Sequence, residues 1–247
     1  MDFGIRGKTA LVLGGTSGIG LAIAECLAGE GASVVVASRN EAKVREAARI
    51  VGGRGFVVDL MSEASIHESV DKLLAETPVD ILVNNTGGPA TGQPAGIPLS
   101  VWDAGYASLL RSVIQVSQLV LPGMRQRAWG RILTITSTSA RELIPGLPVS
   151  STFRAALTAW TKELAREVGR SGVLVNNLLP GPTRTARLAE LAVKSPTFYE
   201  SMESTSSLGR CAEPLEIGRV AAFLCSAANG YVTGTDVLAD GGYTRAL

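Results

Sequence analysis

The sequence is poor in the residues from which metal sites, disulfide frameworks and histidine-based catalysis are built. Its 247 residues include one histidine, His67, and three cysteines, Cys26, Cys211 and Cys225, which are odd in number and have no C-x-x-C spacing. A typical zinc site or a Ser-His-Asp triad needs more than these residues offer. We therefore expect no bound metal, and three free thiols of the kind found in a reducing cytosol.

A strong net charge and long apolar runs are also missing. The formal net charge is +1, aromatic residues make up 5% of the chain and no basic block is present, which argues against a nucleic-acid partner. No apolar run comes near the length of about 18 residues that a membrane-spanning helix needs. The segment Met1–Lys8 lacks the apolar core of a signal peptide. We expect a cytoplasmic protein with neither a nucleic-acid nor a membrane partner.

The sequence is rich in short apolar runs and in glycine. Hydrophobic residues make up 46% of the chain, and its 28 glycines exceed the usual share of about 7%. Seven apolar runs are typical of strands, and their unbroken apolar character predicts a parallel sheet covered on both faces. The predicted strands are 9–12, 33–37, 55–58, 79–83, 130–136, 173–177 and 236–239.

Amphipathic stretches alternate with these strands, which predicts helices packed on the sheet. No linker or internal repeat divides the chain. We therefore predict a single doubly wound α/β domain over residues 1–247, with ligands at the carboxyl ends of its strands. A helical excursion over 184–205 is expected to form a substrate lid. The other predicted helices are 21–28, 41–51, 62–76 with Ser62 as its cap, about 100–126, 149–170 and 214–227.

One turn between a strand and a helix is a candidate ligand site. Within Leu13–Gly20, the residues Gly14, Gly18 and Gly20 have the spacing G-x-x-x-G-x-G, between the first predicted strand and the first predicted helix. Glycines allow a tight turn and a close approach to a pyrophosphate, and a helix N-terminus offers free N–H groups to phosphates. The pattern predicts a dinucleotide site, and a glycine-rich turn without a ligand is the alternative.

The loop after the second predicted strand bears on the type of dinucleotide. Ser38 occupies the position where an acidic residue would bind a ribose 2′-OH, and Arg39 follows it. Because an arginine pairs well with a 2′-phosphate, this loop favours NADP(H) over NAD(H), and a solvated arginine is the alternative. After the third strand, Asp59 either accepts a hydrogen bond from an adenine amino group or caps the next turn.

Two further loops follow strands and carry small residues. Asn84–Gly88 comes after the fourth predicted strand, where glycines let the backbone approach a ligand closely. Leu179–Thr185 comes after the sixth predicted strand, where it is placed to wrap a nicotinamide. Since the carboxyl ends of parallel strands meet at one edge of the sheet, all of these loops should line one crevice.

Together these motifs resemble those of the short-chain dehydrogenase/reductase family, of the type that contains 3-oxoacyl-carrier-protein reductases. The resemblance extends over essentially the whole chain. Leu13–Gly20 is similar to the family's T-G-x-x-x-G-x-G loop with Leu13 in place of threonine, and Asn84–Gly87 is similar to N-N-A-G. Further matches are Pro180-Gly181 with Thr185 for P-G-x-x-x-T, and a C-terminal signature at Gly209-Arg210, Glu213-Pro214, Glu216 and Asp240–Gly242.

The resemblance implies a Rossmann-like fold and an oxidoreductase that uses a nicotinamide cofactor. It also implies a small-molecule or acyl-thioester substrate, and a homo-oligomer, either a dimer or a tetramer, built on the two long central helices. We expect the cofactor to contact Gly14, Thr16, Ser17, Gly18, Ile19, Gly20, Ser38, Arg39, Asp59, Leu60, Asn85, Gly87, Arg154, Pro180, Gly181, Thr183 and Thr185.

The expected catalytic residues depart from the family's pattern. The family uses a serine, a tyrosine thirteen residues later and a lysine four residues after that, with an asparagine earlier in the chain. Its tyrosine transfers a proton at the substrate oxygen, and its lysine lowers the tyrosine pKa and binds the nicotinamide ribose. Here Ser137 falls on the serine, Ser150 on the tyrosine, Arg154 on the lysine and Leu109 on the asparagine.

The resemblance therefore implies an atypical active site made of Ser137, Ser150 and Arg154. A serine hydroxyl is a far weaker acid than a phenol, and arginine keeps its proton at neutral pH. Arg154 and Ser137 can still stabilise a developing alkoxide, but the proton must come from water, Glu142 or Tyr199. Absence of the asparagine is expected to remove a kink in the long helix.

Purely structural roles are the alternatives for these residues. Ser150 and its neighbours can cap the helix that follows Pro148, and Arg154 can pair with Glu142.

Three functions are compatible with the sequence. The first is an NADP-dependent oxidoreductase that moves a hydride between nicotinamide and a carbonyl or secondary alcohol. The second is a catalytically inactive dinucleotide-binding protein, and the third is a non-redox reaction at the polar segment 137–142. The expected lid mixes arginine with apolar side chains, which fits an apolar substrate with an anionic end, or else an ordinary surface helix.

Overall fold

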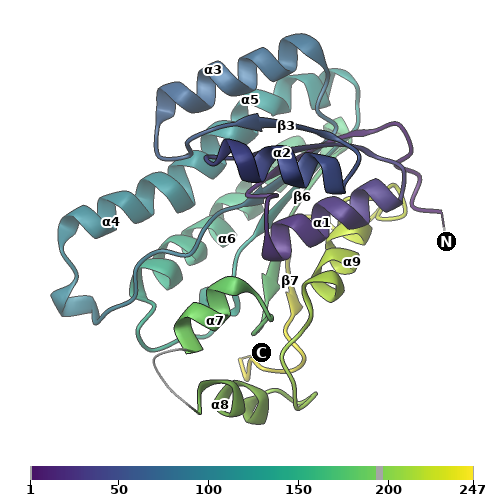
Figure 1. The fold of residues 1–247 in the computed structure, drawn as a ribbon. Helices are drawn as coiled ribbons and strands as arrows, with labels where there is room; N and C mark the ends of the chain where they lie inside the picture. Colours follow the sequence, from purple (N-terminus) through teal and green to yellow (C-terminus); the bar gives the residue numbers. More distant parts are fainter. Residues whose placement is uncertain (1, 193–196, 247) are drawn as a thin grey trace.

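Seven parallel strands form one sheet, in the order β3-β2-β1-β4-β5-β6-β7, with helices on both of its faces (Figure 1). The computed structural model describes residues 2–192 and 197–246. The expected single α/β domain with a seven-stranded parallel sheet is confirmed. Its strands are β1 (Thr9–Leu13), β2 (Ser33–Ser38), β3 (Arg54–Val57), β4 (Ile81–Asn85), β5 (Gly130–Ile135), β6 (Val173–Pro180) and β7 (Asp236–Ala239).

The order of the strands reverses next to β1, which pairs with β2 on one side and with β4 on the other. In a doubly wound sheet this reversal opens a crevice beyond the carboxyl ends of the strands. All five residues of β1 are buried, because helices cover both sides of the strand. The crevice therefore lies at the centre of the sheet, where β1 and β4 end.

Two apolar clusters hold the helices to the sheet, and successive β1 side chains enter opposite clusters. Ala10 and Val12 pack with α1, α2 and α9, whereas Leu11 and Leu13 pack with α3, α5 and α6. The helices are α1 (Gly18–Gly29), α2 (Glu41–Ile50), α3 (Glu63–Glu76), α4 (Leu99–Gly105), α5 (Ser112–Gln126), α6 (Pro148–Val168), α7 (Ala186–Ala192), α8 (Phe198–Thr205) and α9 (Pro214–Leu224).

The segment expected to be one long helix over 100–126 is interrupted. A π-helical turn, Tyr106–Arg111, joins α4 to α5 and contains the buried Leu109. The hydroxyl of Ser108 donates to the carbonyl of Ala104, and that of Ser112 donates to the carbonyl of Ser108. The expectation that the helix becomes regular without an asparagine is therefore wrong: the π-helical turn is present, directly after Gly105, where α4 approaches Val149 of α6 closely.

The expected lid is helical where it is described. It consists of α7 and α8, while residues 193–196 between them lie outside the described residues. The hydroxyl of Tyr243, near the C-terminus, contacts the sulfur of Met202 in α8. The C-terminal segment therefore supports α8 from beside the sheet.

Some further expectations concern single residues. Ser62 caps α3, because its hydroxyl accepts a hydrogen bond from the backbone N–H of Ser65 at 3.2 Å. All three cysteines are free, and burial raises the pKa of the Cys225 thiol to about 12. None of the helices in the described ranges combines the length and the apolar character needed to cross a membrane. No cluster of three metal-ligating side chains occurs within the same ranges.

Candidate active site

A cavity of about 990 Å³ opens where the strands end, and loops after β1 to β6 form its wall. It gathers every predicted site residue except Gly20. The predicted residues that line it are Gly14, Thr16, Ser17, Gly18, Ile19, Ser38, Arg39, Asp59, Leu60, Asn85, Gly87, Ser137, Ser150, Arg154, Pro180, Gly181, Thr183 and Thr185.

The glycine loop after β1 has a backbone that side chains would not permit. Gly14 and Gly18 have φ angles of +59° and +53°, in the left-handed region that favours glycine. Gly20 does not line the cavity; a Cβ there would collide with the carbonyl of Gly14. Its missing side chain thus allows α1 to begin directly against the loop. The first N–H groups of α1 are the kind of donors that bind phosphate oxygens.

The two asparagines at the end of β4 have different environments. Asn85 lines the cavity, and its side-chain amide donates to the carbonyl of Gly14 at 3.1 Å. Asn84 is buried in the core, where its amide donates to the hydroxyl of Ser117 at 3.1 Å. Asn85 therefore fixes the glycine loop against the next strand, whereas Asn84 anchors β4 to α5.

One end of the cavity is cationic. Arg39 follows β2, and Lys43 in the first turn of α2 joins it in the lining. Lys43 was not predicted from the sequence, although its position four residues after Arg39 is a signal that could have revealed it. Asp59 also lies here, and its Oδ1 accepts from the N–H of Met61 at 3.0 Å. The carboxylate therefore caps its own turn, as one of the two alternatives predicted, while it still lines the cavity.

Ser137, Ser150 and Arg154 come together at the other end of the cavity. Ser137 begins a short 3₁₀ turn after β5, and its hydroxyl accepts from the N–H of Ser139 at 3.1 Å. Ser150 and Arg154 lie one turn apart on α6, and the Arg154 Nε donates to the Ser150 hydroxyl at 3.1 Å. Spacing of i and i+4 places both side chains on the cavity face of α6.

Arg154 is a buried cation without a carboxylate partner among the described residues. Its Nη1 donates to the carbonyls of Ile135 and Thr136, each at 2.8 Å, and its Nη2 makes no hydrogen bond in the described ranges. The residue is only 7% exposed, and burial lowers the pKa of its guanidinium to about 10. It is therefore still charged at neutral pH, and an uncompensated buried charge is costly unless a ligand balances it.

The two structural contacts named as alternatives, capping of α6 by Ser150 and a pair between Arg154 and Glu142, are not formed among the described residues. Leu147, not a serine, precedes the first turn of α6, and the Ser150 hydroxyl bonds Arg154 instead of capping the helix. Glu142 does not pair with Arg154; its Oε2 accepts from the backbone N–H groups of Arg245 at 2.6 Å and Ala246 at 3.2 Å. Both backbone donors engage the same carboxylate oxygen, so Glu142 is already bonded to the C-terminal segment.

The two side chains expected to supply a proton do not line the cavity. Glu142 is engaged with the C-terminal backbone, and Tyr199 packs against Phe198 and lies under the guanidinium of Arg184. In the described part of the chain, the ionisable groups that line the cavity are those of Arg39, Lys43, Asp59, Arg154 and Arg187. Of the three proton sources expected from the sequence, water is the one that remains compatible with the described lining.

Arg187 of α7 also lines the cavity, and the sequence analysis did not single it out. The one sequence feature that could have indicated this role is its place two residues after Thr185, the threonine of the P-G-x-x-x-T loop. The side chain lies beside Leu188 and against the loop after β4, so the expected lid does contribute to the wall. Thr86, Gly88 and Pro182 line the cavity as parts of the loops predicted to do so, although they were not named individually. The unpredicted lining residues include Ala37, Asn40, Val58, Met61, Ser108, Ile135, Thr136 and Ala186.

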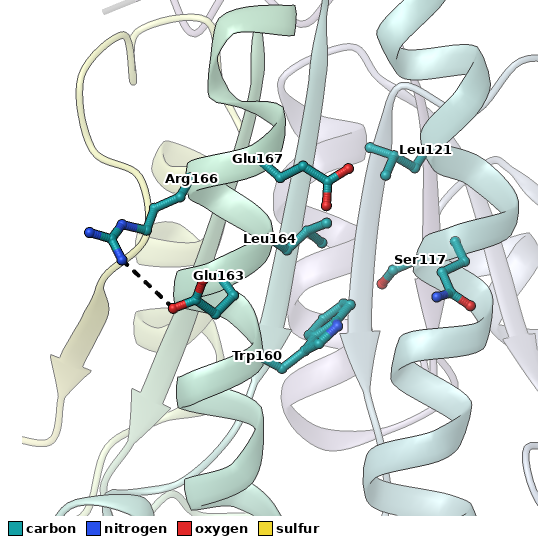
Figure 2. Close-up of a pocket in the computed structure, with 8 residues that line it drawn as sticks. Ser117, Leu121, Trp160, Glu163, Leu164, Arg166 and Glu167 are labelled. Atoms are coloured by element: carbon teal, nitrogen blue, oxygen red, sulfur yellow. Dashed lines mark ion pairs between the residues drawn. The ribbon is translucent and has the colours of Figure 1, made fainter.

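A second cavity, of about 710 Å³, lies between α5 and α6. Figure 2 shows Trp160 and Leu164 extending from α6 toward Leu121 of α5, with Glu163 and Arg166 on the outer side of α6. Trp160 and Leu164 are only half-buried. This face lies on the two long central helices, away from the loops that form the first cavity.

The sequence matches known proteins over nearly its whole length. A sequence profile described as Enoyl-(Acyl carrier protein) reductase matches residues 14–244. Dehydrogenase/reductase SDR family member 4 from Bos taurus is 34% identical over 242 residues, covering 95% of this chain and 86% of that protein. The 3-oxoacyl-(acyl-carrier-protein) reductase FabG from Aquifex aeolicus is 32% identical over 249 residues, covering 98% of this chain and 99% of that protein.

Solved structures agree with these sequence matches. L-sorbose reductase from Gluconobacter frateurii, crystallised with NADPH and L-sorbose, superposes with a TM-score of 0.94. The two sequences are 30% identical, and the alignment covers 100% of both chains. The likeness thus includes the loops at the carboxyl ends of the strands as well as the sheet.

Proposed function

Because the chain belongs to the short-chain dehydrogenase/reductase family of NAD(P)-dependent oxidoreductases, we propose that it transfers a hydride between NADP(H) and a carbonyl or secondary alcohol. The atypical active site consists of Ser137, Ser150 and Arg154. The observation that carries this proposal is Arg154, a charged side chain buried in the cavity wall with no carboxylate among the described residues to balance it. A developing alkoxide is the kind of charge that such a group stabilises.

The residues of the cavity fit a dinucleotide. The left-handed glycines leave room for a pyrophosphate beside the N-terminus of α1, and the glycines after β4 and β6 would hold the nicotinamide end. Bound NADP(H) supplies or accepts the hydride. Arg154 and the hydroxyls of Ser137 and Ser150 would hold the carbonyl oxygen as negative charge grows on it, and water would then donate one proton to that oxygen.

The preference for NADP(H) is supported by the cationic end of the cavity. Arg39 is an exposed residue of the cavity wall at that end, and Lys43 lines the wall four residues later. The Asp59 carboxylate accepts a hydrogen bond from the backbone N–H of Met61 in its own turn. Arg39 and Lys43 would pair with a 2′-phosphate, which NAD(H) does not carry. We expect NADPH to bind about 10-fold or more tightly than NADH, since one well-placed charged hydrogen bond is worth that much.

The direct test is cofactor oxidation with a panel of ketones and β-ketoacyl thioesters, each assayed with NADPH and with NADH. We expect stoichiometric consumption of NADPH and formation of the alcohol for at least one substrate. Product formation without net NADPH consumption would instead support a non-redox reaction. Absence of turnover with every substrate, while NADPH still binds, would contradict the proposal.

An inactive dinucleotide-binding protein is the second candidate. It is favoured by one observation: among the described residues, no tyrosine, histidine, cysteine or glutamate lines the cavity. A positioned general acid is worth about 10²–10⁴ in rate, so its absence removes a large part of the family's catalytic power. The two candidates share the cofactor site and differ only in whether Arg154 and water suffice for turnover.

We also propose that two copies of the chain associate through α5 and α6, as a dimer or within a tetramer. The half-buried Trp160 and Leu164 would fill the gap between these helices in a partner copy (Figure 2). Glu167 of α6 pairs with Arg125 of α5 at 3.4 Å, so this face carries both signs of charge, which allows self-complementary contacts around a twofold axis.

Replacing Leu164 with arginine should convert the oligomer to a monomer, because a charged side chain would enter the apolar centre of the contact. Light scattering coupled to gel filtration would measure the mass. Leu143→Arg is the matched control, since Leu143 is 81% exposed in a loop away from this face. A wild-type protein that is already monomeric at micromolar concentration would contradict the proposal, and so would a Leu164→Arg variant of unchanged mass.

A further inference from the structure

Two arginines line the end of the cavity where the proposed substrate would lie. Arg154 belongs to the wall and is almost fully buried, while Arg187 reaches in from α7. Their origins are far apart in the sequence, and the fold brings both to the same cavity. The hydride-transfer proposal uses Arg154 at the reacting oxygen and leaves Arg187 without a role.

Arg187 is held across the cavity by contacts to the loop after β4. Its Nη2 donates to the carbonyl of Pro89 at 3.1 Å. Its Nε lies over Gly88, where an added Cβ would be only 3.3 Å from that nitrogen. A Cβ at position 88 would make a tight contact with this nitrogen and require the guanidinium to shift by a few tenths of an ångström. The hydrogen bond to Pro89 and the contact with Gly88 place the half-exposed guanidinium between α7 and the loop after β4.

The charge of Arg187 is poorly compensated. Its contact with Glu190 joins Nη1 to Oε2 at 3.4 Å, and the two side chains are 47% and 68% exposed. Exposed ion pairs of this kind contribute little, since water screens them and both side chains are mobile. A ligand that excludes water from the cavity would make a stronger partner.

No carboxylate of the described lining opposes these two arginines. The acidic residue of the lining is Asp59, which follows β3 at the opposite, cationic end and accepts from the N–H of Met61. Arg154 and Arg187 thus give the substrate end of the cavity two positive charges, and among the described residues their one acidic partner is the exposed Glu190, which lies outside the lining. Such a site attracts anions and disfavours cationic substrates.

We propose that the substrate carries a carboxylate and that Arg187 binds it while the reacting carbonyl faces Arg154. The substrate would then be an oxo acid, or the hydroxy acid for the reverse direction. A planar guanidinium matches a carboxylate through two parallel hydrogen bonds. The assignment rests on the proposed function, because it places the carbonyl beside Arg154, and it makes Arg187 the residue that determines specificity.

The test uses binding rather than turnover. Malonate, a dicarboxylate that cannot be reduced, is titrated by calorimetry into the protein saturated with NADP⁺, at fixed ionic strength. We expect malonate to bind, and malonamide, its neutral analogue, to bind at least about 10-fold more weakly. Arg187→Gln should weaken malonate binding by about 10–100-fold, since hydrogen bonds to charged groups are worth that much.

Arg170→Gln is the matched control, because it removes the same charge from an exposed position that precedes β6, at the opposite edge of the sheet. Its malonate affinity should equal that of the wild type. Undetectable malonate binding, or equal affinity in the Arg187→Gln variant, would overturn the inference. Tighter binding of inorganic phosphate than of malonate would overturn the choice of carboxylate. Malonate binding by a protein that turns over no carbonyl compound would refute the proposed reaction and leave the anion site standing.

Discussion

The double variant Ser150→Tyr/Arg154→Lys is expected to reduce carbonyl substrates about 10²–10⁴ times faster than the wild-type protein, because it adds a positioned general acid. The two positions lie one turn apart on α6 and both line the cavity. A phenol at position 150 would extend beyond the present serine hydroxyl into the cavity. The lysine would lie beside it and lower its pKa by its positive charge.

The pH dependence separates this effect from a change in binding. In the described wild-type cavity no histidine, cysteine or tyrosine is present, and Arg154 stays charged through the neutral range because the pKa of its guanidinium is about 10. We expect kcat of the wild type to change little between about pH 6 and 8.5. The kcat of the double variant should instead change with pH in this range, because its phenol ionises there.

Single variants and one displaced tyrosine serve as controls. Ser150→Tyr alone should gain less, since Arg154 is held by the carbonyls of Ile135 and Thr136 and is less free to follow the phenol. Thr152→Tyr adds the same side chain on the same helix at an exposed position outside the cavity, and should leave the rate unchanged. A double variant no faster than the wild type would show that proton supply does not limit the reaction.

The fold was accessible from the sequence because it depends on patterns that act over short distances. Unbroken apolar runs marked the strands, and the predicted last strand, 236–239, coincides with β7. Parallel pairing then places the carboxyl ends together, so the loops after β1, β2 and β6 could be assigned to one crevice before their geometry was known. For this reason nearly all the predicted site residues line the same cavity.

The break between α4 and α5 was not accessible in the same way. The segment 100–126 is helical by pattern throughout, and the π-helical turn inside it is set by tertiary contacts. Gly105 lies where a Cβ would collide with the side chain of Val149 on α6, so α4 and α6 approach closely just before the turn. Such a contact joins residues more than forty positions apart and has no signature in the local sequence.

Individual side-chain partners were also beyond sequence reasoning. Glu142 was expected near Arg154, but it binds the backbone of the C-terminal segment. Arg187 was passed over because its role depends on where α7 lies relative to the loop after β4. Residue type and order along the chain predict which end of the sheet a side chain reaches. They do not predict which neighbour it meets there.

Arg154→Met is expected to lower kcat/KM for carbonyl reduction by about 10²–10³-fold, or about 2.7–4 kcal/mol, the usual effect of removing one donor aimed at a developing oxyanion. Methionine has a similar length and leaves the cavity wall filled, but it carries no charge. Arg154→Lys should lose less, because it keeps the charge and loses only the fork of donors. Thermal melting followed by circular dichroism would verify that both variants are folded. An Arg154→Met variant within twofold of the wild type would remove Arg154 from the mechanism.

The titration of Arg154 gives the same prediction a second readout. Burial disfavours the charged form, so the folded protein releases this proton at about pH 10, whereas the unfolded chain holds it to a higher pH. Below pH 10 the buried charge costs stability, and that cost is relieved as the pH rises through 10, because the unfolded state then binds more protons. Activity should move in the opposite direction and fall through the same range, since the charge is lost. The falling limb should be absent in Arg154→Met. A stabilising anion beside Arg154 should shift the limb upward, because it favours the charged form.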